Sequence, residues 1–442
     1  MTVNREAPIL RWWPVLLVLC VLLPEWNVYA APFPQQDTNK HLGVASCASS
    51  TCHGAVSESK ESNVWRNEYR IWSKHDTHAQ AFKVLQNAQS KAIAAKLGIG
   101  DPTKAKECLD CHADNVSAAA RGPKFQISDG VGCEACHGGS EKWIKTHTEP
   151  GVSHAQNLAQ GMYPTEDPAA RAELCLSCHL GNENQFATHR IMGAGHPRMS
   201  FELDTFTVLQ PAHYSVDEDY VKRKGNITDP TLWATGQVRS AKRIASLLDS
   251  HWFKAPSMVP EPSFFDCHAC HHPMSDLRWQ ASDLGAGMPP GAIRLNDAPM
   301  SMLKVIADRI NPALGQELLA ATRGLHKASL NSREAVIGAA KTLRSVCDRL
   351  ETSIASAAFA PADLRAMMTA IVVQSGNGEY RDYTSAEQAV MAIDMMVITL
   401  GAADKVKGEM DKLYGLVEDE HHFSPKEFAA ALRTMSPRFK AL

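Results

Sequence analysis

The sequence has no excess of basic residues and no unusual content of glycine or proline. Its 442 residues include 45 lysines and arginines against 48 aspartates and glutamates, a formal net charge of −3. Proteins that bind nucleic acid neutralise its phosphates with cations, so this balance argues against a nucleic-acid partner. With 27 glycines, 24 prolines and 44% hydrophobic residues, the composition also excludes a collagen-like repeat and a disordered chain. The sequence is that of a globular protein, long enough for two or three domains.

A hydrophobic run long enough to span a membrane is also missing near the amino terminus. The apolar stretch 12–23 is shorter than the roughly 20 residues that a membrane-spanning helix needs. It follows Arg5 and Arg11 and precedes residues 28–30, which have the spacing of a signal-peptidase site. We therefore expect residues 1–30 to be a cleaved signal peptide. The mature chain would then have no stable membrane span and would be periplasmic or otherwise extracytoplasmic, where the environment is oxidising.

Cysteine and histidine are what the sequence has in abundance, with 12 and 19 residues respectively. Cys20 lies in the predicted signal peptide, and Cys347 stands alone. The other ten cysteines form five close pairs, and each pair is followed directly by a histidine. The five motifs are CASSTCH (Cys47, Cys52, His53), CLDCH (Cys108, Cys111, His112), CEACH (Cys133, Cys136, His137), CLSCH (Cys175, Cys178, His179) and CHACH (Cys267, Cys270, His271).

The pattern Cys-x-x-Cys-His is the attachment motif of c-type haem. Its two thiols form thioethers with the vinyl groups of the haem, and the histidine binds the iron as the proximal ligand. Disulfides would not require a histidine after every second cysteine, and zinc sites favour paired knuckles without it. We therefore predict five covalently bound haem c (heme c) groups with their iron. The first motif has four residues between its cysteines instead of two, a span that can still reach both vinyl groups.

The haem motifs occupy residues 47–271, where strand signals are sparse. Pro- and Gly-rich connectors separate short helical stretches such as 65–85 and 237–248. Each porphyrin is a large apolar body around which side chains can pack, so a small conventional core is acceptable here. We predict a multihaem cytochrome domain over residues 31–290, with little regular structure and few strands.

The character of the chain changes after about residue 297. Apolar residues recur at spacings of three and four, as at Leu343, Val346, Leu350 and Ile354. This predicts an all-helical bundle of about five helices over residues 291–442, and hence a mainly α fold for the whole protein.

Most of the sulfur and imidazole side chains of the predicted bundle are expected to be structural. We expect Cys347 to be buried among apolar residues and the methionines to fill the core rather than bind iron. The methionines concerned are Met367, Met368, Met391, Met395 and Met396. Three histidines, His326, His421 and His422, are expected on the surface.

Five irons can take up to five distal ligands, and bis-histidine ligation is the natural use of the remaining histidines of the haem-binding part. Eleven are available there: His41, His75, His78, His147, His154, His189, His196, His213, His251, His268 and His272. His78 is favoured over its neighbour His75, because it lies beside an apolar helical face. His147 follows the proximal His137 by ten residues, too close for the same iron, so it should reach another haem.

His189 and His196 bracket a glycine-rich loop and are further candidates for iron ligation, together with His213. His251 is less favoured. His268 and His272 flank a proximal histidine and are expected to be wall residues.

Over roughly residues 43–185 the chain resembles the multihaem cytochromes of the cytochrome c-554 type, which are relatives of the electron acceptor of hydroxylamine oxidoreductase. The resemblance rests on the order and flanks of four motifs. They are the first attachment site with the His-Ala-Gln-Ala element at 78–81, CLDCH at 108–112, GVGCEACHG at 130–138 and CLSCH at 175–179.

This resemblance implies that His147 binds the first haem and His78 the third. It also implies that the second haem, on His112, can lack a distal ligand. The chain departs from the family in its wider first motif, its fifth haem site and its helical carboxyl-terminal part.

Chained haems predict an electron carrier that exchanges electrons with redox proteins, the helical part serving for docking or for a homo-oligomer. The alternative is a haem enzyme of nitrogen-oxide or hydroxylamine chemistry at a five-coordinate haem. Pentahaem nitrite reductases use a Cys-x-x-Cys-Lys site, and no such motif occurs. The electron carrier is therefore favoured, and no residue is assigned a catalytic role.

Overall fold

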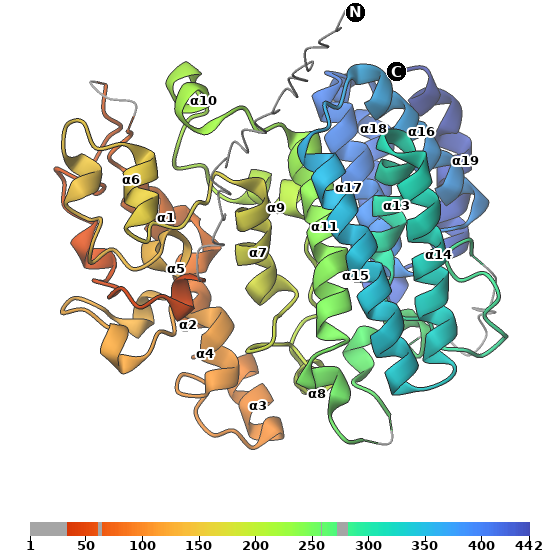
Figure 1. The fold of residues 1–442 in the computed structure, drawn as a ribbon, viewed down its shortest axis with the longest axis horizontal. Helices are drawn as coiled ribbons and strands as arrows, with labels where there is room; N and C mark the ends of the chain where they lie inside the picture. The colour runs from red at the N-terminus through yellow and green to blue at the C-terminus, as the bar shows by residue number, and fades with distance from the viewer. Residues whose placement is uncertain (1–32, 61–63, 258, 272–281) are drawn as a thin grey trace, which may run out of the picture. The chain divides into compact units, whose positions relative to one another are not determined.

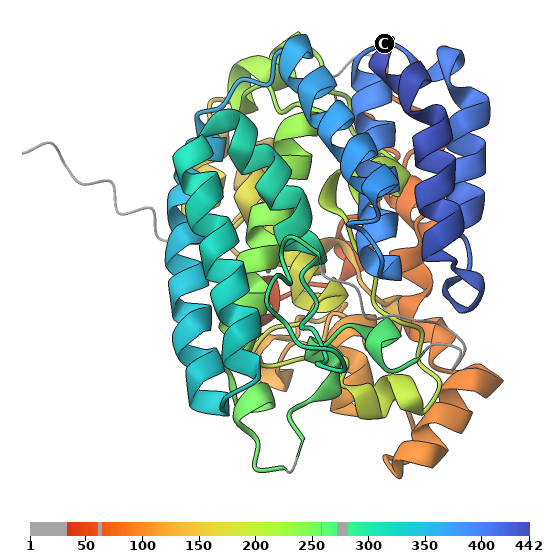
Figure 2. The ribbon, with the colours of Figure 1, turned by 90° about the vertical axis from the view of Figure 1, so that its right-hand side faces the viewer.

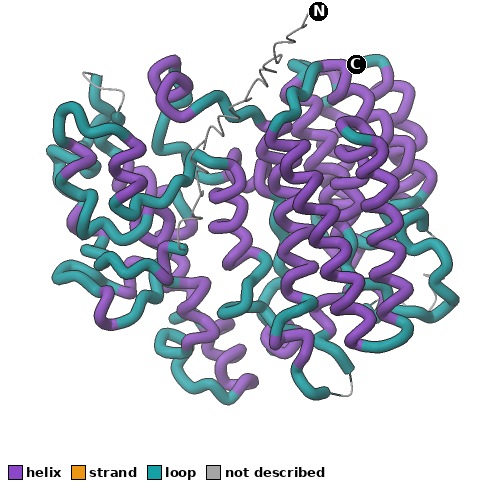
Figure 3. Tube along the Cα trace, in the orientation of Figure 1, coloured by secondary structure: helices purple, strands orange, loops and turns teal. Residues whose placement is uncertain are grey.

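The fold consists of α-helices joined by turns and loops. The computed structural model describes residues 33–60, 64–257, 259–271 and 282–442. Within these ranges there is no β-strand, and extended backbone pairs only in two isolated bridges, His41 with Arg121 and Phe265 with Leu295 (Figure 3). The expected mainly α fold is confirmed. The predicted signal peptide and His272 lie outside the described residues.

The haem-motif part of the chain contains short helices. They are α1 (Glu68–His75), α2 (Ala81–Val84), α3 (Ala88–Leu97), α4 (Lys106–His112), α5 (Cys133–His137), α6 (His154–Ala159), α7 (Pro168–His179), α8 (His189–Gly193), α9 (Leu203–Leu209) and α10 (Glu218–Lys224). The prediction of a single helix over 65–85 is wrong, because helix α1 ends at His75 and does not continue through Asp76. That residue has extended backbone, and its carboxylate caps the following 3-10 turn by accepting from the backbone N–H of His78.

The helices of the second part are longer. They are α11 (Asp229–Leu247), α12 (His251–Lys254), α13 (Ala298–Ile310), α14 (Pro312–Ser329), α15 (Arg333–Ala355), α16 (Pro361–Asn377), α17 (Tyr383–Thr399), α18 (Lys407–Leu416) and α19 (Pro425–Lys440). Seven of these α-helices follow residue 291 in the described chain, rather than about five. Proline opens α14, α16 and α19, where its missing N–H has no helical partner to lose.

Helix α15 shows why these residues form a bundle. Ser332 caps its first turn by accepting from the N–H of Ala335. The predicted apolar positions Leu343, Val346, Leu350 and Ile354 are all buried, so the stripe faces the core as expected. Cys347 lies on the same buried stripe, and the five methionines expected in the core are buried too.

One hydrophobic core extends through α11 and α13–α19. Figures 1 and 2 show these helices side by side, beside the region of short helices. Helix α11 precedes the predicted boundary at residue 290, yet it packs against α13 and α15 on one side and α7 on the other. The division into domains at that residue stays a prediction.

Among its described residues, the haem-motif part forms two small hydrophobic clusters, one of which includes Leu232 of α11. One consists of Phe82, Leu85, Leu109 and Ala113, and the other of Ala172, Leu176, Leu203 and Leu232. This contrast with the bundle is what a region packed around porphyrins would show, because the apolar material there is supplied by the cofactor.

Ion pairs also join α11 to its neighbours α7 and α15. Arg243, which is buried, pairs with Glu173 of α7, and Lys242 pairs with Glu351 of α15 at 2.9 Å. Arg239 contacts both of these glutamates. The helix that carries the fourth haem motif is therefore held against the bundle by charge as well as by packing.

Leu303 on α13 is fully buried in the large core. We expect Leu303→Ala to lower the free energy of unfolding by about 2–5 kcal/mol, through lost burial and the cavity left behind. Denaturant unfolding followed by circular dichroism measures this. Ile398→Ala, at a 52% exposed position of the neighbouring α17, is the control and should change it by less than about 0.5 kcal/mol. Equal effects of the two substitutions would contradict the assigned core.

Two buried acids lie at the start of α9. Glu202 accepts hydrogen bonds from the backbone N–H groups of Asp204 and Thr205. Asp204 is 3% exposed, and its Oδ1 has no hydrogen-bond partner among the described residues. Burial, and then the charge of Glu202, raise the pKa of Asp204 to about 8, so its carboxyl carries a proton at neutral pH.

This raised pKa predicts how stability depends on pH. The unfolded carboxyl titrates near its ordinary value of 3.8. Between about pH 4 and pH 8 the folded state therefore binds more protons, and its stability falls as the pH rises. Asp204→Asn mimics the protonated acid, so its melting temperature should exceed that of the wild type by a margin that grows from pH 4 to pH 8. A margin independent of pH would show that Asp204 is ionised in the folded protein.

Candidate haem-binding site

Three of the attachment motifs lie at the ends of helices. Helices α4, α5 and α7 each end on the motif histidine, His112, His137 and His179. Residues three and four apart share one face of a helix, so both cysteines and the histidine of a motif are presented to the same side. The two cysteines and the histidine of each of these motifs therefore form one surface, as attachment to a single haem would require.

The first and fifth motifs lie in turns instead. In each of them the histidine donates its backbone N–H to the carbonyl of the first cysteine, His53 to Cys47 at 3.1 Å and His271 to Cys267 at 2.8 Å. The wider first motif therefore closes in the same way as a motif of ordinary spacing. All ten motif cysteines are free of disulfides, which leaves their thiols available for thioether bonds.

The histidines of the five motifs each have a second histidine ring opposite them. The pairs and the distances between their ring centres are His53–His147 (6.3 Å), His112–His196 (6.2 Å), His137–His213 (6.4 Å), His179–His78 (6.3 Å) and His271–His189 (6.1 Å). Bonds between a first-row metal ion and an imidazole nitrogen are about 2 Å long, so two such nitrogens on opposite sides of one ion lie about 4 Å apart and their ring centres about 6 Å apart. All five pairs have the separation of two axial ligands of one iron.

Hydrogen bonds at Nδ1 orient several of these rings. The Nδ1 of His53 bonds to Glu68 at 2.9 Å and that of His78 to Asp76 at 2.8 Å. Backbone carbonyls take this place in three other histidines: His112 bonds to Ala81 at 3.0 Å, His147 to Trp143 at 3.2 Å and His196 to Pro197 at 2.8 Å. A partner at Nδ1 fixes the ring and leaves Nε2 for a metal, as in most protein metal sites.

Burial also favours the form of histidine that binds metal. It lowers the pKa of His137 to about 3 and that of His179 to about 4, with further lowering by the charges of His213 and His78 respectively. Both rings are therefore neutral at physiological pH, and only a neutral imidazole can donate its nitrogen to iron.

Other histidines have Nε2 engaged by the protein. The Nε2 of His41 bonds to the carbonyl of Pro34, that of His154 to Glu166, and that of His268 to the carbonyl of Glu420. These three are structural. That His268 lines the wall of a haem site stays a prediction.

His326 was expected on the surface, and this is wrong. The side chain is 1% exposed, and its Nε2 bonds to the buried carboxylate of Asp297 at 2.8 Å. The residue lies on the buried face of α14, where Asp297 is the partner of Nε2, while Nδ1 has no hydrogen-bond partner among the described residues. His422 is exposed, as expected, and bonds to Asp419.

The ring pairs differ from the ligand assignment that the family resemblance implies. His147 does face the first proximal histidine. His78, however, faces His179 of the fourth motif, and His213 takes the place opposite His137. The position opposite His112, which the family can leave empty, is taken by His196. Sequence spacing missed these pairings, although the Asp-x-His pattern at 76–78 is a local signal for an anchored ligand.

Four of the five pairs line one cavity of about 1610 Å³. Its wall includes eight of the motif cysteines and four cationic side chains, Lys145, Arg171, Arg223 and Lys224. The indole Nε1 of Trp143, also on this wall, has no hydrogen-bond partner among the described residues. Haem fits such a space, because it is apolar in the middle and its propionates need cations and N–H donors.

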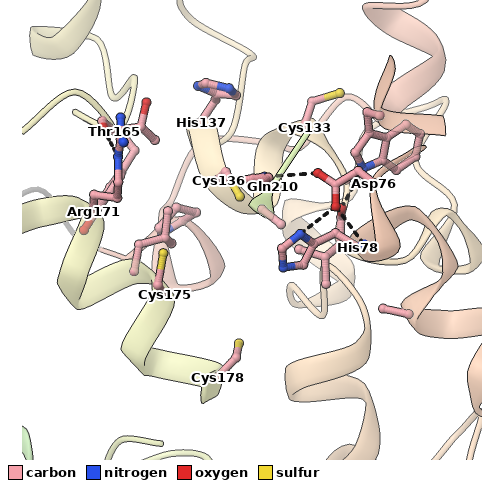
Figure 4. A pocket seen from close by; sticks show the side chains of 18 of the residues that line it. Asp76, His78, Cys133, Cys136, His137, Thr165, Arg171, Cys175, Cys178 and Gln210 are labelled. Carbon is pink, nitrogen blue, oxygen red and sulfur yellow. Dashed lines mark hydrogen bonds and ion pairs between the residues drawn. The ribbon is translucent and has the colours of Figure 1, made fainter. Parts of the chain in front are cut away.

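Contacts between thiols show which motifs are neighbours. Cys47 of the first motif lies close enough to Cys133 of the third, and Cys111 of the second to Cys178 of the fourth, for each thiol to shift the pKa of the other. Cys136 of the third motif lies close enough to Cys175 of the fourth to feel its charge. Figure 4 shows Cys133 and Cys136 of α5 with His137, and Cys175 and Cys178 along α7. Around the cavity the motifs therefore follow the order first, third, fourth, second.

Residues 46–138 match the family model described as cytochrome c554 and c-prime. Over these residues, about a fifth of the chain, the sequence is that of a c-type cytochrome. The matched residues contain the first three attachment motifs of the cytochrome together with His78, and they end before the fourth motif. No curated protein and no solved structure was found to match the chain. The family resemblance expected from the motifs is confirmed.

Asp76 is the clearest electrostatic influence on a candidate ligand of the cytochrome. It is 5% exposed and accepts from both His78 and Gln210 (Figure 4). Burial opposes its ionisation, but these hydrogen bonds outweigh burial and lower its pKa to about 2. A buried carboxylate at Nδ1 makes the imidazole a stronger donor and stabilises the more positive, ferric state of an iron bound to it.

We expect Asp76→Asn to raise the reduction potential of one haem, that held by His78 and His179. The shift should be of the order of 59 mV, a tenfold change in a one-electron equilibrium. Potentiometric titration followed by visible absorption measures it. Asp101→Asn, which removes an exposed carboxylate bonded to Thr103, is the control and should move no midpoint. A uniform shift of all midpoints in Asp76→Asn would contradict this role.

Proposed function

We propose that the protein is an exported, periplasmic pentahaem c-type cytochrome that carries electrons between redox proteins through covalently bound haem c. The observation that carries this proposal is the set of five histidine ring pairs. Each proximal histidine has a partner at the separation of a second axial ligand, so no iron is left with an open side for a substrate.

The residues have separate tasks in this proposal. The ten motif cysteines attach the haems, and the proximal ligands are His53, His112, His137, His179 and His271. The distal ligands are His147, His196, His213, His78 and His189. Once bound, haem supplies one-electron chemistry at iron, while the chain sets the axial ligands, the orientation of the rings and the local dielectric.

Two histidine ligands favour a low reduction potential compared with a histidine and a methionine. The methionines of the bundle are buried in its own core, which agrees with their having no role at iron. A series of haems that each have two histidine ligands would pass single electrons from one haem to the next. Turnover of a nitrogen oxide or of hydroxylamine would need a vacant coordination position, and His196 stands where the family can leave one open.

The ring planes predict the spectrum of the oxidised protein. The rings are close to parallel in the pairs of His53 and His271, at 12° and 31°, and close to perpendicular in the other three, at 80–89°. The axial ligands shape the electronic structure of the iron, so two classes of low-spin signal should occur in a ratio of two to three. A pyridine haemochrome assay should count five haems per chain, and electron paramagnetic resonance should show no high-spin iron.

A pair of variants tests the distal position. His196→Ala should create one high-spin iron that binds nitric oxide, because it opens the site opposite His112. His75→Ala, which removes an exposed histidine of the same cavity wall, should leave all iron low-spin. A high-spin, nitric-oxide-binding fraction in the wild-type protein would instead favour the enzyme.

A further inference from the structure

The fifth histidine pair lies apart from the other four. His189 and His271 are not among the residues that line the shared cavity. The family match also ends long before the fifth motif. How the fifth haem relates to the rest therefore has to come from the structure around this pair.

Helix α8 links the fifth pair to the second. His189 is its first residue and faces His271, while His196 follows shortly after its end and faces His112. A helix rises about 1.5 Å per residue, so the five residues of α8 span only about 7.5 Å. Two candidate iron ligands from different haem sites thus stand on one short segment.

Hydrogen bonds make this segment continuous. Beyond the helix, the N–H of Gly195 donates to the carbonyl of Met192 at 2.9 Å, and that of His196 to the carbonyl of Ile191 at 3.3 Å. At the other end, the N–H of His189 donates to Glu261, which lies shortly before the fifth motif, at 2.7 Å. The two histidines are therefore held at a set separation rather than on independent loops.

The bundle holds both sides of this segment. Arg198, two residues after His196, pairs with Glu387 at 3.0 Å and Glu420 at 2.7 Å, and its guanidinium lies 4.7 Å from the ring centre of Tyr383. His268, inside the fifth motif, stacks on the same Tyr383 at 6.0 Å and bonds to the carbonyl of Glu420 at 3.2 Å. The flanks of the second and fifth sites therefore meet on the same two bundle residues.

We propose that residues 188–198 form a two-haem ligand clamp that places the fifth haem beside the second and so extends the row to first, third, fourth, second, fifth. The bundle supports the clamp through Tyr383 and Glu420. This inference rests on the proposed electron-carrier function and adds the position of the fifth haem to it. The exchange is of one electron: one iron goes from ferrous to ferric as the other goes from ferric to ferrous, and no proton is required.

The test changes an axial ligand of one haem at a time, so that the reduction potential of this haem is separated from those of the others. His196→Met should raise the potential of the second haem and His147→Met that of the first, because a methionine ligand raises the potential of haem iron. Each tagged haem then titrates apart from the others. In both backgrounds the fifth haem is removed by Cys267→Ser together with Cys270→Ser, and the loss is verified as four haems per chain.

The proposal predicts unequal responses. Removing the fifth haem should change the one-electron equilibrium of the second haem about tenfold, a midpoint shift of about 59 mV. The midpoint of the first haem, at the far end of the row, should not change. No shift at the second haem, or equal shifts at both, would overturn the clamp.

A second measurement keeps all five haems and does not depend on the folding of the cysteine variant. In His189→Met the reduction potential of the fifth haem is raised instead. Arg198→Ala is then added, which removes the ion pairs between the clamp and the bundle. The midpoint of the tagged haem should shift, and the near-perpendicular signal of the second haem should change with it. Arg349→Ala, which breaks an exposed ion pair with Glu317 elsewhere in the bundle, is the control and should leave both unchanged.

These outcomes separate the two proposals. Five low-spin haems without any coupling between the second and the fifth would overturn the clamp and leave the electron carrier standing. High-spin iron in the wild-type protein would count against the carrier itself.

Discussion

The separation of five pairs of imidazole rings is the constraint on which the haem-binding part of this cytochrome depends. Each pair joins segments that are distant in sequence, such as His53 with His147 and His112 with His196. The described residues of the same region form two small hydrophobic clusters around a cavity of about 1610 Å³. Ligation by iron would therefore do what a hydrophobic core does in the bundle, and folding of this region would be coupled to cofactor attachment.

Candidate iron ligands and structural histidines differ in which of their ring nitrogens is hydrogen-bonded to the protein. Carboxylates or carbonyls hold Nδ1 of His53, His78, His112, His147 and His196, and Nε2 stays available. In His41, His154, His268 and His326 a protein acceptor occupies Nε2. The candidate ligands also differ in the kind of group that accepts the hydrogen bond from Nδ1. A carboxylate beside one ligand and a carbonyl beside another give chemically identical haems different surroundings, which is how one chain can hold haems of different potential.

Local patterns predicted much of this molecule from its sequence. The attachment motifs are short-range features, and so is the apolar spacing along α15, so the family and the mainly α fold could both be anticipated. The distal pairings could not, because spacing does not report which loop returns to which motif. For that reason His78, which the family pattern assigns to the third motif, was misassigned: it faces the fourth motif, and His213 faces the third. The surface prediction for His326 failed because the sequence around a single polar residue on a helix does not show that a buried acid from another segment, Asp297, is its partner.

The order of the paired histidines along the chain has a consequence for biogenesis. The partners of the first three motif histidines, His147, His196 and His213, all come later in the sequence, whereas His78 and His189 precede the motifs they face. Were the chain exported amino end first, as proposed above, three irons would have one coordination side uncovered until the later histidines are exported, whereas the last two would meet ligands already exported. Iron with an open coordination side would then be a property of the nascent chain and not of the folded protein.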